Sequence, residues 1–355
     1  MKVAFFISDH GYGHITRNLP IARELIARGH EVAIVTGMEQ AKVAKPYLNN
    51  VPDTSFCVCE TDAGLVVYPG TLKIDRQSTI DKIESHLQQW PRLISSAPDA
   101  DVYVVDIVPW ALIAAKERGI RSILITNFTW VEQYLPFASL KTVEKYKSAY
   151  RLADKVIYYE LANQAVRDML GKGADIGLVC RPFNAEKVKQ IKEQHQRPVV
   201  FMSLGRSNTG LNFEIDVSGL PYDFIVTSSL NVKGDNVQRL DVSVENTQDY
   251  LKASDICIAK AGWSTVAEAL LAGVKLVLVN RSDTPEDTMT IDILKTRGDA
   301  VSVTVDDLKN FENIISNVLN KKWNIKQYDN NYTKIADLIC EGKTDAKMTK
   351  LRNSR

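Results

Sequence analysis

Residues 3–19 of the chain read VAFFISDHGYGHITRNL: a short apolar run, a turn with two glycines, and then apolar residues at helical spacing. An apolar run of this length is typical of a buried parallel strand. The helix after it is indicated by the spacing of Ile15, Leu19, Ala22, Leu25 and Ile26. Gly29 is placed to end that helix, and residues 31–35 predict the next strand. Because proline is tolerated in the first turn of a helix, Pro20 lets this helix begin anywhere from residue 14 to residue 19.

This strand–turn–helix pattern recurs in both halves of the chain. In the first half, further strands are expected at residues 102–106, 122–126, 155–159 and 176–180, with a helix at 110–118. In the second half, strands are expected at 199–204, 224–227, 255–259, 275–279 and 300–303, and helices at 247–253, 265–272, 285–296 and 307–319. Such alternation predicts an α/β protein with two Rossmann-like, doubly wound parallel sheets. Ligands of these sheets bind beyond the carboxyl ends of the strands, so we expect a site in a cleft between the halves.

The length of 355 residues also favours two domains, because it exceeds what one compact core usually reaches. We expect a first Rossmann-like domain at residues 1–182 and a second at residues 198–325. The charged stretch 183–197 is interpreted as the linker between them. Residues 326–355 are expected to form a C-terminal segment that can pack back on the first domain.

Charge and cysteine content exclude several classes of protein. The 44 basic and 43 acidic side chains give a formal net charge of +1, which argues against nucleic acid as a partner. Five cysteines without a CxxC pair indicate neither a disulfide framework nor a metal site, and no cofactor is expected. The beginning of the sequence does not resemble a signal peptide, and no apolar stretch is long enough to cross a membrane. We therefore expect a cytoplasmic protein, and peripheral membrane contact stays open.

The first turn carries the residue best suited to acid–base chemistry. Gly11 and Gly13 let the backbone approach a ligand closely, and the helix that follows directs its N-terminus at the same place. His14 at this position is a candidate general base; alternatively, it is a polar residue that bonds locally at the helix end. Asp106 ends a strand expected beside the first one, so it can orient His14, or it can cap the next helix.

The second half has a comparable turn in residues 255–268, DICIAKAGWSTVAE. The strand, glycine turn and helix place free N–H groups and one lysine where phosphates bind. Glu268 can accept hydrogen bonds from a ribose diol, or it can complete a capping box with Thr265. The candidate donor-binding residues of this half are Gly205, Ser207, Lys260, Ala261, Gly262, Trp263, Ser264, Thr265, Glu268, Glu286 and Asp287. The last two acids can contact sugar hydroxyls or simply complement a helix dipole.

These motifs resemble the GT-B glycosyltransferase superfamily, and most of all its antibiotic, plant and peptidoglycan-type members that use UDP- or TDP-sugars. Gly13-His14 is similar to the turn whose histidine is the general base in that family, and Asp106 resembles its partner. The run from Ala261 to Glu268 resembles the donor signature, with phosphates at the glycine turn and ribose on the glutamate. Lys260 stands where relatives carry His or Arg, and Glu286-Asp287 replaces their usual Asp-Gln or Gln-Gln.

The resemblance implies a metal-independent, inverting transferase that moves a sugar from a nucleotide diphosphate sugar, UDP above all, to an acceptor hydroxyl. The acceptor is expected to be a small molecule, a glycan or a lipid-linked compound bound by the first half. The Gly-His-x-x-Arg turn that ends at Arg17 also resembles a nucleotide-sugar hydrolase of bacterial nonulosonate synthesis and the N-terminal region of arabinose kinases. We expect the Arg17 side chain to face solvent rather than a phosphate. The alternatives to a transferase are such a hydrolase and a non-catalytic subunit that binds nucleotide-sugars.

Overall fold

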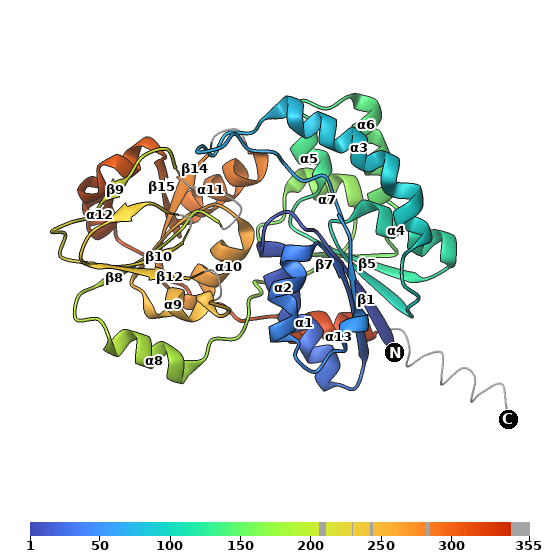
Figure 1. Ribbon diagram of the computed structural model, residues 1–355, viewed down its shortest axis with the longest axis horizontal. Helices are drawn as coiled ribbons and strands as arrows, with labels where there is room; N and C mark the ends of the chain where they lie inside the picture. Colours follow the sequence, from blue (N-terminus) through green and yellow to red (C-terminus); the bar gives the residue numbers. More distant parts are fainter. Residues whose placement is uncertain (206–210, 229, 242–243, 282–283, 342–355) are drawn as a thin grey trace.

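The computed structural model describes all residues except 206–210, 229, 242–243, 282–283 and 342–355. Two parallel sheets lie side by side, each covered by helices (Figure 1). The expected α/β fold with two Rossmann-like halves is confirmed. None of the described helices is long and apolar enough to cross a membrane.

The first sheet has seven parallel strands in the order β3-β2-β1-β4-β5-β6-β7. Their bounds are β1 Lys2–Ile7, β2 Glu31–Thr36, β3 Phe56–Val58, β4 Val102–Asp106, β5 Arg121–Thr126, β6 Lys155–Tyr158 and β7 Ala174–Asp175. The helices of this half are α1 Gly13–Ala27, α2 Met38–Tyr47, α3 Arg76–Ser95, α4 Pro109–Arg118, α5 Trp130–Tyr134, α6 Leu140–Tyr150 and α7 Gln164–Leu170, with a 3-10 turn at Asp53–Ser55. Because β1 pairs with β4 in register Ile7↔Asp106, the turns after these two strands are neighbours.

The second sheet has six parallel strands in the order β12-β10-β8-β13-β14-β15. Their bounds are β8 Val199–Ser203, β10 Asp223–Thr227, β12 Val237–Leu240, β13 Ile256–Lys260, β14 Lys275–Asn280 and β15 Ala300–Thr304; β9 Ile215–Asp216 and β11 Val232–Lys233 form a separate pair. The helices are α8 Ala185–Glu193, α9 Thr247–Ala253, α10 Trp263–Ala272, α11 Pro285–Arg297 and α12 Phe311–Asn320, with a 3-10 turn at Asp306–Lys309. The strand order changes direction between β8 and β13, so a crevice opens at their carboxyl ends.

Three expected elements differ from the structure. The strand expected at 176–180 is absent, and β7 is instead the short pair Ala174–Asp175. The helix expected at 307–319 is divided, because Asn310 leaves the 3-10 turn and caps α12 through its side chain, which accepts from the N–H of Asn313. Helix α1 begins at Gly13, so Pro20 lies inside it rather than in its first turn.

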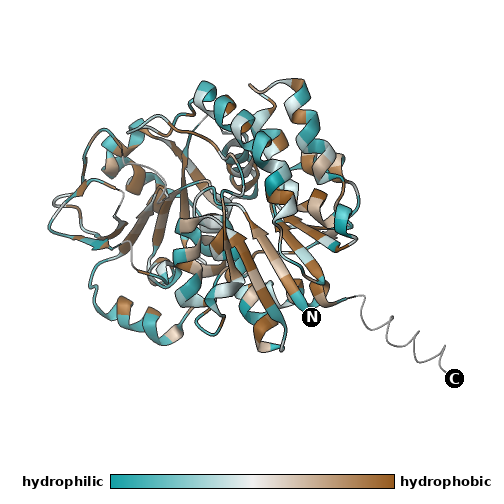
Figure 2. Cartoon of the chain, turned by 45° about the vertical axis from the view of Figure 1, so that its right-hand side comes forward, coloured by the Kyte–Doolittle hydropathy of each residue, from teal (hydrophilic) through white to brown (hydrophobic). Residues whose placement is uncertain are grey.

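Hydrophobic residues are concentrated in the strands of both sheets and along one side of many helices (Figure 2), and their buried members form the core. The last described helix, α13 Tyr332–Cys340, returns to the first half and packs against α1. Ile335, Ala336 and Ile339 of α13 are fully buried there. The end of the chain thus supports the helix that carries His14.

Candidate functional site

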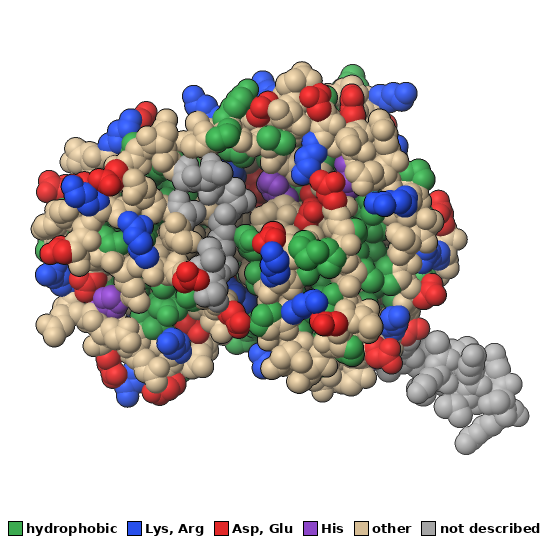
Figure 3. Space-filling view, viewed as in Figure 1, with side chains coloured by type: hydrophobic (Ala, Val, Ile, Leu, Met, Phe, Trp, Pro, Cys, Tyr) green, Lys and Arg blue, Asp and Glu red, His purple; other side chains and the backbone are tan. Residues whose placement is uncertain are grey.

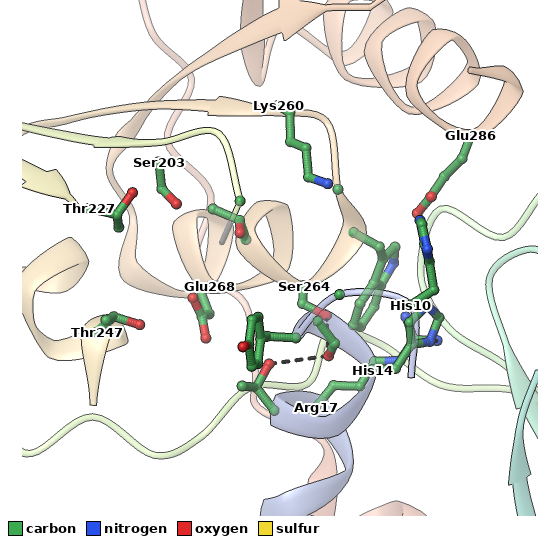
Figure 4. Close-up of a pocket in the computed structure, with 18 of the residues that line it drawn as sticks. His10, His14, Arg17, Ser203, Thr227, Thr247, Lys260, Ser264, Glu268 and Glu286 are labelled. Atoms are coloured by element: carbon green, nitrogen blue, oxygen red, sulfur yellow. Dashed lines mark hydrogen bonds between the residues drawn. The ribbon is translucent and has the colours of Figure 1, made fainter. Parts of the chain in front are cut away.

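A pocket lies between the two halves, where the carboxyl ends of both sheets meet. The space-filling view shows a hollow there in which histidine and acidic side chains are visible (Figure 3). The pocket is lined from the first half by the turn after β1 and by α5, and from the second half by the turns after β8, β13 and β14. Figure 4 shows His10, His14 and Arg17 on one side and Lys260, Ser264 and Glu268 around the same space.

His14, which lines this pocket, contacts the fully buried Asp106 behind it. The His14 Nδ1 atom lies 2.8 Å from Asp106 Oδ1. The same carboxylate accepts from Arg17 Nε at 2.6 Å and from Asn18 Nδ2 at 2.5 Å. Arg17 NH2 also lies 2.9 Å from Nδ1, but it donates to Asp106 Oδ1 as well. Because an ionised carboxylate only accepts, we assign the ring proton to Nδ1 of His14, which leaves the lone pair on Nε2. Asp106 therefore orients His14 and does not cap α4, whose N-cap is Val108.

Arg17 is buried, which contradicts the expectation that it faces solvent. Only 2% of its surface is exposed. Besides Asp106, its guanidinium donates to Asn127 Oδ1 at 3.0 Å and lies over the rings of Tyr159 and Trp263. The fully buried carboxylate of Asp106 needs a counter-charge, because an unpaired buried charge is costly. The Arg17 guanidinium supplies that charge and is therefore buried as well.

These neighbours determine the charge of the site. Burial would raise the pKa of Asp106, but Arg17 and His14 outweigh it and hold that pKa well below its usual range. Burial and the nearby Arg17 charge lower the pKa of His14 below 6.5, although Asp106 opposes them. At neutral pH the cluster thus consists of an ionised Asp106, a charged Arg17 and a neutral His14, which is the form that accepts a proton.

The backbone after Asp106 is held in an unusual conformation. Ile107 has a φ of 55°, in the left-handed region that β-branched residues rarely adopt. The Ile107 carbonyl accepts a hydrogen bond of 2.8 Å from the hydroxyl of Tyr150, which is buried. Strain of this kind persists only where the surroundings enforce it, and here it lies directly after the residue that holds His14.

The second half contributes a cation above a glycine turn. Lys260 ends β13, and its Cε atom would lie 3.0 Å from a Cβ at Gly205, so only glycine fits at 205 without a shift. Burial and the charge of Arg281 lower the pKa of Lys260 to about 8. Helix α10 follows with Gly262 as its N-cap and no side-chain cap, so its first N–H groups stay available to a ligand.

Glu268 lies in the pocket and does not form the capping box. Its Oε1 accepts from Arg181 NH2 at 3.2 Å, an ion pair of two buried side chains. Arg181 also donates to the carbonyl of Glu245 and to Thr247 Oγ1. Thr265 lines the same pocket. Glu268 is therefore fixed by Arg181, which lies at the end of the first half, and it lines the pocket beside α10.

The two halves touch each other directly at the pocket. Ser264 Oγ donates to the carbonyl of Gly13 at 2.7 Å. A Cβ added at Gly13 would lie 3.0 Å from the same Ser264 Oγ. Asn127 Nδ2 donates to Glu286 Oε1 at 3.2 Å. A side chain at position 13 would therefore crowd Ser264, and Asn127 links Arg17 to Glu286 across the cleft.

The remaining candidate residues have different environments. Glu286 lines the pocket, and burial together with Asp287 raises its pKa against the effect of nearby cations. Asp287 is fully buried, and both its oxygens accept from Arg281, so its carboxylate is not presented to the pocket. Ala261 is fully buried behind the turn, and the Trp263 indole donates to the Glu160 carbonyl. Ser207 lies outside the described residues.

Several pocket residues escaped the sequence analysis: His10, Gln133, Arg181, Ser203, Thr227 and Arg281. His10 lies in the glycine turn after β1, and burial lowers its pKa well below 6.5. Its Nδ1 accepts from the N–H of Leu65 at 3.3 Å, so Nε2 carries the proton of this neutral ring. Arg181 gave no local signal, because its partners lie more than 60 residues away.

Comparisons with known proteins agree with this architecture. Residues 219–341 match the model of the glycosyltransferase family 28 C-terminal domain. The chain is 26% identical over 301 residues to L-arabinokinase of Arabidopsis thaliana, a match that covers 78% of this chain and 28% of that protein. It is 26% identical over 311 residues to an uncharacterized glycosyltransferase of Methanosarcina acetivorans, covering 78% and 79% of the two chains.

Among solved structures, UGT89C1 of Arabidopsis thaliana complexed with UDP aligns with a TM-score of 0.63 at 14% identity, over 96% of this chain and 99% of the other. CalG4, the calicheamicin glycosyltransferase, aligns with a TM-score of 0.56 at 16% identity, over 89% of each chain. The fold is thus that of GT-B glycosyltransferases. The second half, residues 219–341, also carries the match to the glycosyltransferase family 28 C-terminal domain.

Proposed function

We propose that this protein transfers a sugar from a nucleotide diphosphate sugar, UDP-linked in the first instance, to an acceptor hydroxyl bound by the first half. The observation that carries the proposal is His14 itself. Its ring is held by Asp106 at 2.8 Å and belongs to the same pocket as Lys260 and the free N-terminus of α10. One side of the pocket thus offers a proton acceptor, and the other offers the groups that bind a diphosphate.

In the proposed reaction, Nε2 of His14 removes the proton of the acceptor hydroxyl while its oxygen attacks the anomeric carbon. The bond from that carbon to the diphosphate breaks on the opposite face, so the configuration inverts. Asp106 stabilises the imidazolium that forms, and it stays ionised because Arg17 and Asn18 donate to it. The nucleoside diphosphate leaves with the bonding electron pair, and Lys260 together with the N–H groups after Gly262 stabilises its charge.

The nucleoside of the donor is assigned to the part of the pocket near Glu268. That carboxylate is held by Arg181, and Ser203, Thr227 and Thr247 line the same side of the pocket (Figure 4). We assign the ribose diol to Glu268, since a carboxylate accepts from two neighbouring hydroxyls. A solved structure of the same fold, UGT89C1 of Arabidopsis thaliana, is complexed with UDP, which supports a uridine nucleotide as the ligand class.

A thermal-shift screen tests the donor class. UDP, UDP-sugars, GDP-mannose, NAD and ATP are compared at equal concentrations, and a ligand present at 100 times its Kd is expected to stabilise the protein by about 2.7 kcal/mol. We expect UDP and UDP-sugars to raise the melting temperature and NAD to leave it unchanged. Stabilisation by NAD alone would contradict the proposal. Release of free sugar without an acceptor, as fast as any transfer, would indicate a hydrolase instead.

A further inference from the structure

Gln133 carries an amide for which the protein provides no partner. The residue lies on α5, only 1% of its surface is exposed, and it borders the pocket. Neither Oε1 nor Nε2 has a hydrogen-bond partner among the residues that the structure describes. A buried amide in this condition loses its hydration without compensation, so it destabilises the folded protein unless a ligand or an ordered water binds it.

The short helix that carries Gln133 is firmly fixed. Thr129 and Glu132 form a capping box at its start. Next to Gln133, the Tyr134 hydroxyl donates to the Gly64 carbonyl at 3.1 Å, and the Tyr134 ring stacks on Trp130. Because the backbone on both sides of Gln133 is held, its amide stays at the pocket wall. The amide therefore presents an unpaired donor and an unpaired acceptor to the pocket.

A second unpartnered group borders the same pocket from the other half. Thr284 precedes α11, is 2% exposed, and its Oγ1 has no partner within the described chain. It is the N-cap residue of α11, but its side chain makes no capping bond. Helices α5 and α11 contact each other across the cleft. The two polar groups therefore flank one region of the pocket, and Glu286 in the first turn of α11 lies in the same region.

We propose that Gln133 and Thr284 bind hydroxyl groups of the sugar that is transferred, and that Gln133 is a specificity-determining residue for that sugar. The inference rests on the proposed function, since it places the diphosphate at Lys260 and Gly262 and lets the sugar extend towards α11. A ring hydroxyl both donates and accepts, and a primary amide offers both complements at once. A sugar that lacks the matching hydroxyl, or carries it in the other configuration, leaves the amide unpaired and binds more weakly.

The test compares Gln133→Met and Thr284→Val with wild type in two measurements. The first is the melting temperature without ligand, and the second is the further increase that a nucleotide-sugar gives over its free nucleotide. The probes are UDP-glucose, UDP-galactose, UDP-N-acetylglucosamine, GDP-mannose and dTDP-glucose, each paired with its free diphosphate. Tyr146→Phe is the matched control, because its buried hydroxyl is also unpartnered in the described structure but does not line the pocket.

We expect all three variants to be at least as stable as wild type without ligand, because each removes an unpaired buried polar group. Gln133→Met should lose the sugar-dependent increase and the preference between UDP-glucose and UDP-galactose, and kcat/KM for the preferred donor should fall tenfold or more. Its response to the free diphosphate, and every response of Tyr146→Phe, should match wild type.

Two results would overturn the inference while leaving the proposed function intact. One is a sugar-dependent increase that persists in Gln133→Met and Thr284→Val. The other is a lower melting temperature of unliganded Gln133→Met together with a lost response to free diphosphate, since the amide would then support the structure of the site. If no nucleotide-sugar stabilises wild type more than its free nucleotide does, the donor assignment of the proposed function fails as well.

Discussion

His14 is the residue on which the proposed chemistry depends, because it combines a defined tautomer with an unprotonated state at neutral pH. Asp106 fixes Nδ1 as the protonated nitrogen, and burial together with Arg17 lowers the pKa of the ring. Asn18 and Arg17 keep Asp106 from turning away. The base is therefore a property of four side chains rather than of His14 alone.

Replacement of His14 and of Asp106 should have different consequences for stability. His14→Gln should reduce kcat by about 10²- to 10⁴-fold, the usual contribution of a general base, with little change in melting temperature. Asp106→Asn should reduce kcat and also destabilise the protein by about 3–5 kcal/mol, because Arg17 is left buried without its counter-charge. Steady-state kinetics and urea unfolding measure both effects. Equal stability of Asp106→Asn and wild type would mean that the buried ion pair contributes less than we infer.

The pH profile of kcat/KM should have two limbs. The imidazole accepts a proton only when neutral, so the rate should fall as the pH decreases through the lowered pKa of His14, below 6.5. The ammonium of Lys260 stabilises the leaving diphosphate only when charged, so the rate should fall as the pH rises through its pKa of about 8. Lys260→Arg should remove the alkaline limb, because a guanidinium stays charged throughout. An alkaline limb that survives in Lys260→Arg would assign it to another group.

The role of Glu268 in ribose binding predicts a dependence on the ribose hydroxyls. Wild type should bind UDP at least tenfold more tightly than 2′,3′-dideoxy-UDP, because the carboxylate loses its hydrogen-bond donors with the latter. Glu268→Ala should bind both ligands with equal, weaker affinity, as measured by calorimetry. Ser264→Ala serves as the control, since it keeps Glu268 and should still discriminate. A discrimination that Glu268→Ala retains would place the ribose elsewhere.

At the scale of elements, the strand–glycine–helix units were predictable because their signals are local. The apolar run before His14 and the run before Gly262 specify strands and turns within about 15 residues, and both turns line the pocket. The break at Asn310 between the 3-10 turn and α12 depends on a side-chain cap, which the spacing of apolar residues does not reveal. The absence of a strand at 176–180 depends on packing, which that spacing does not reveal either. The burial of Arg17 was mispredicted for a related reason, since its partner Asp106 is 89 residues away.

Helix α10 shows how the same sequence fits two interpretations that only the fold separates. Thr265 and Glu268 have the spacing of a capping box, yet the helix begins at Trp263 and Glu268 pairs with Arg181. A capping box would need Thr265 as the N-cap, but the N-cap of α10 is Gly262, so Thr265 already lies inside the helix. With this start, the first N–H groups of the helix have no side-chain cap, and Glu268 lines the pocket while paired with Arg181.

At the scale of the whole molecule, the site depends on how the two halves are held together. Ser264 bonds to Gly13, the Trp263 indole bonds to the Glu160 carbonyl at 2.6 Å, and Arg297 pairs with Glu160. Helix α13 adds a further connection: the chain returns from the second half to the first, where α13 packs on α1. The positions of His14 and Lys260 relative to each other are a consequence of these contacts.

The packing of α13 can be tested with Ile335→Ala. The side chain is fully buried against α1, so the truncation should cost about 2–5 kcal/mol of unfolding free energy. Leu140→Ala is a suitable control, since that side chain is 79% exposed. Thermal or urea unfolding gives both values. A loss for Ile335→Ala as small as that of the control would show that α13 does not stabilise the first half.

The most direct test of the central claim is a proton NMR time course with a UDP-α-sugar, the protein and a panel of hydroxyl acceptors. If His14 activates an acceptor that displaces UDP from the opposite face, the donor's anomeric signal disappears and the first product carries the β configuration. His14→Ala should slow this conversion at least a hundredfold. A first product of α configuration, or an unchanged rate in His14→Ala, would contradict the account.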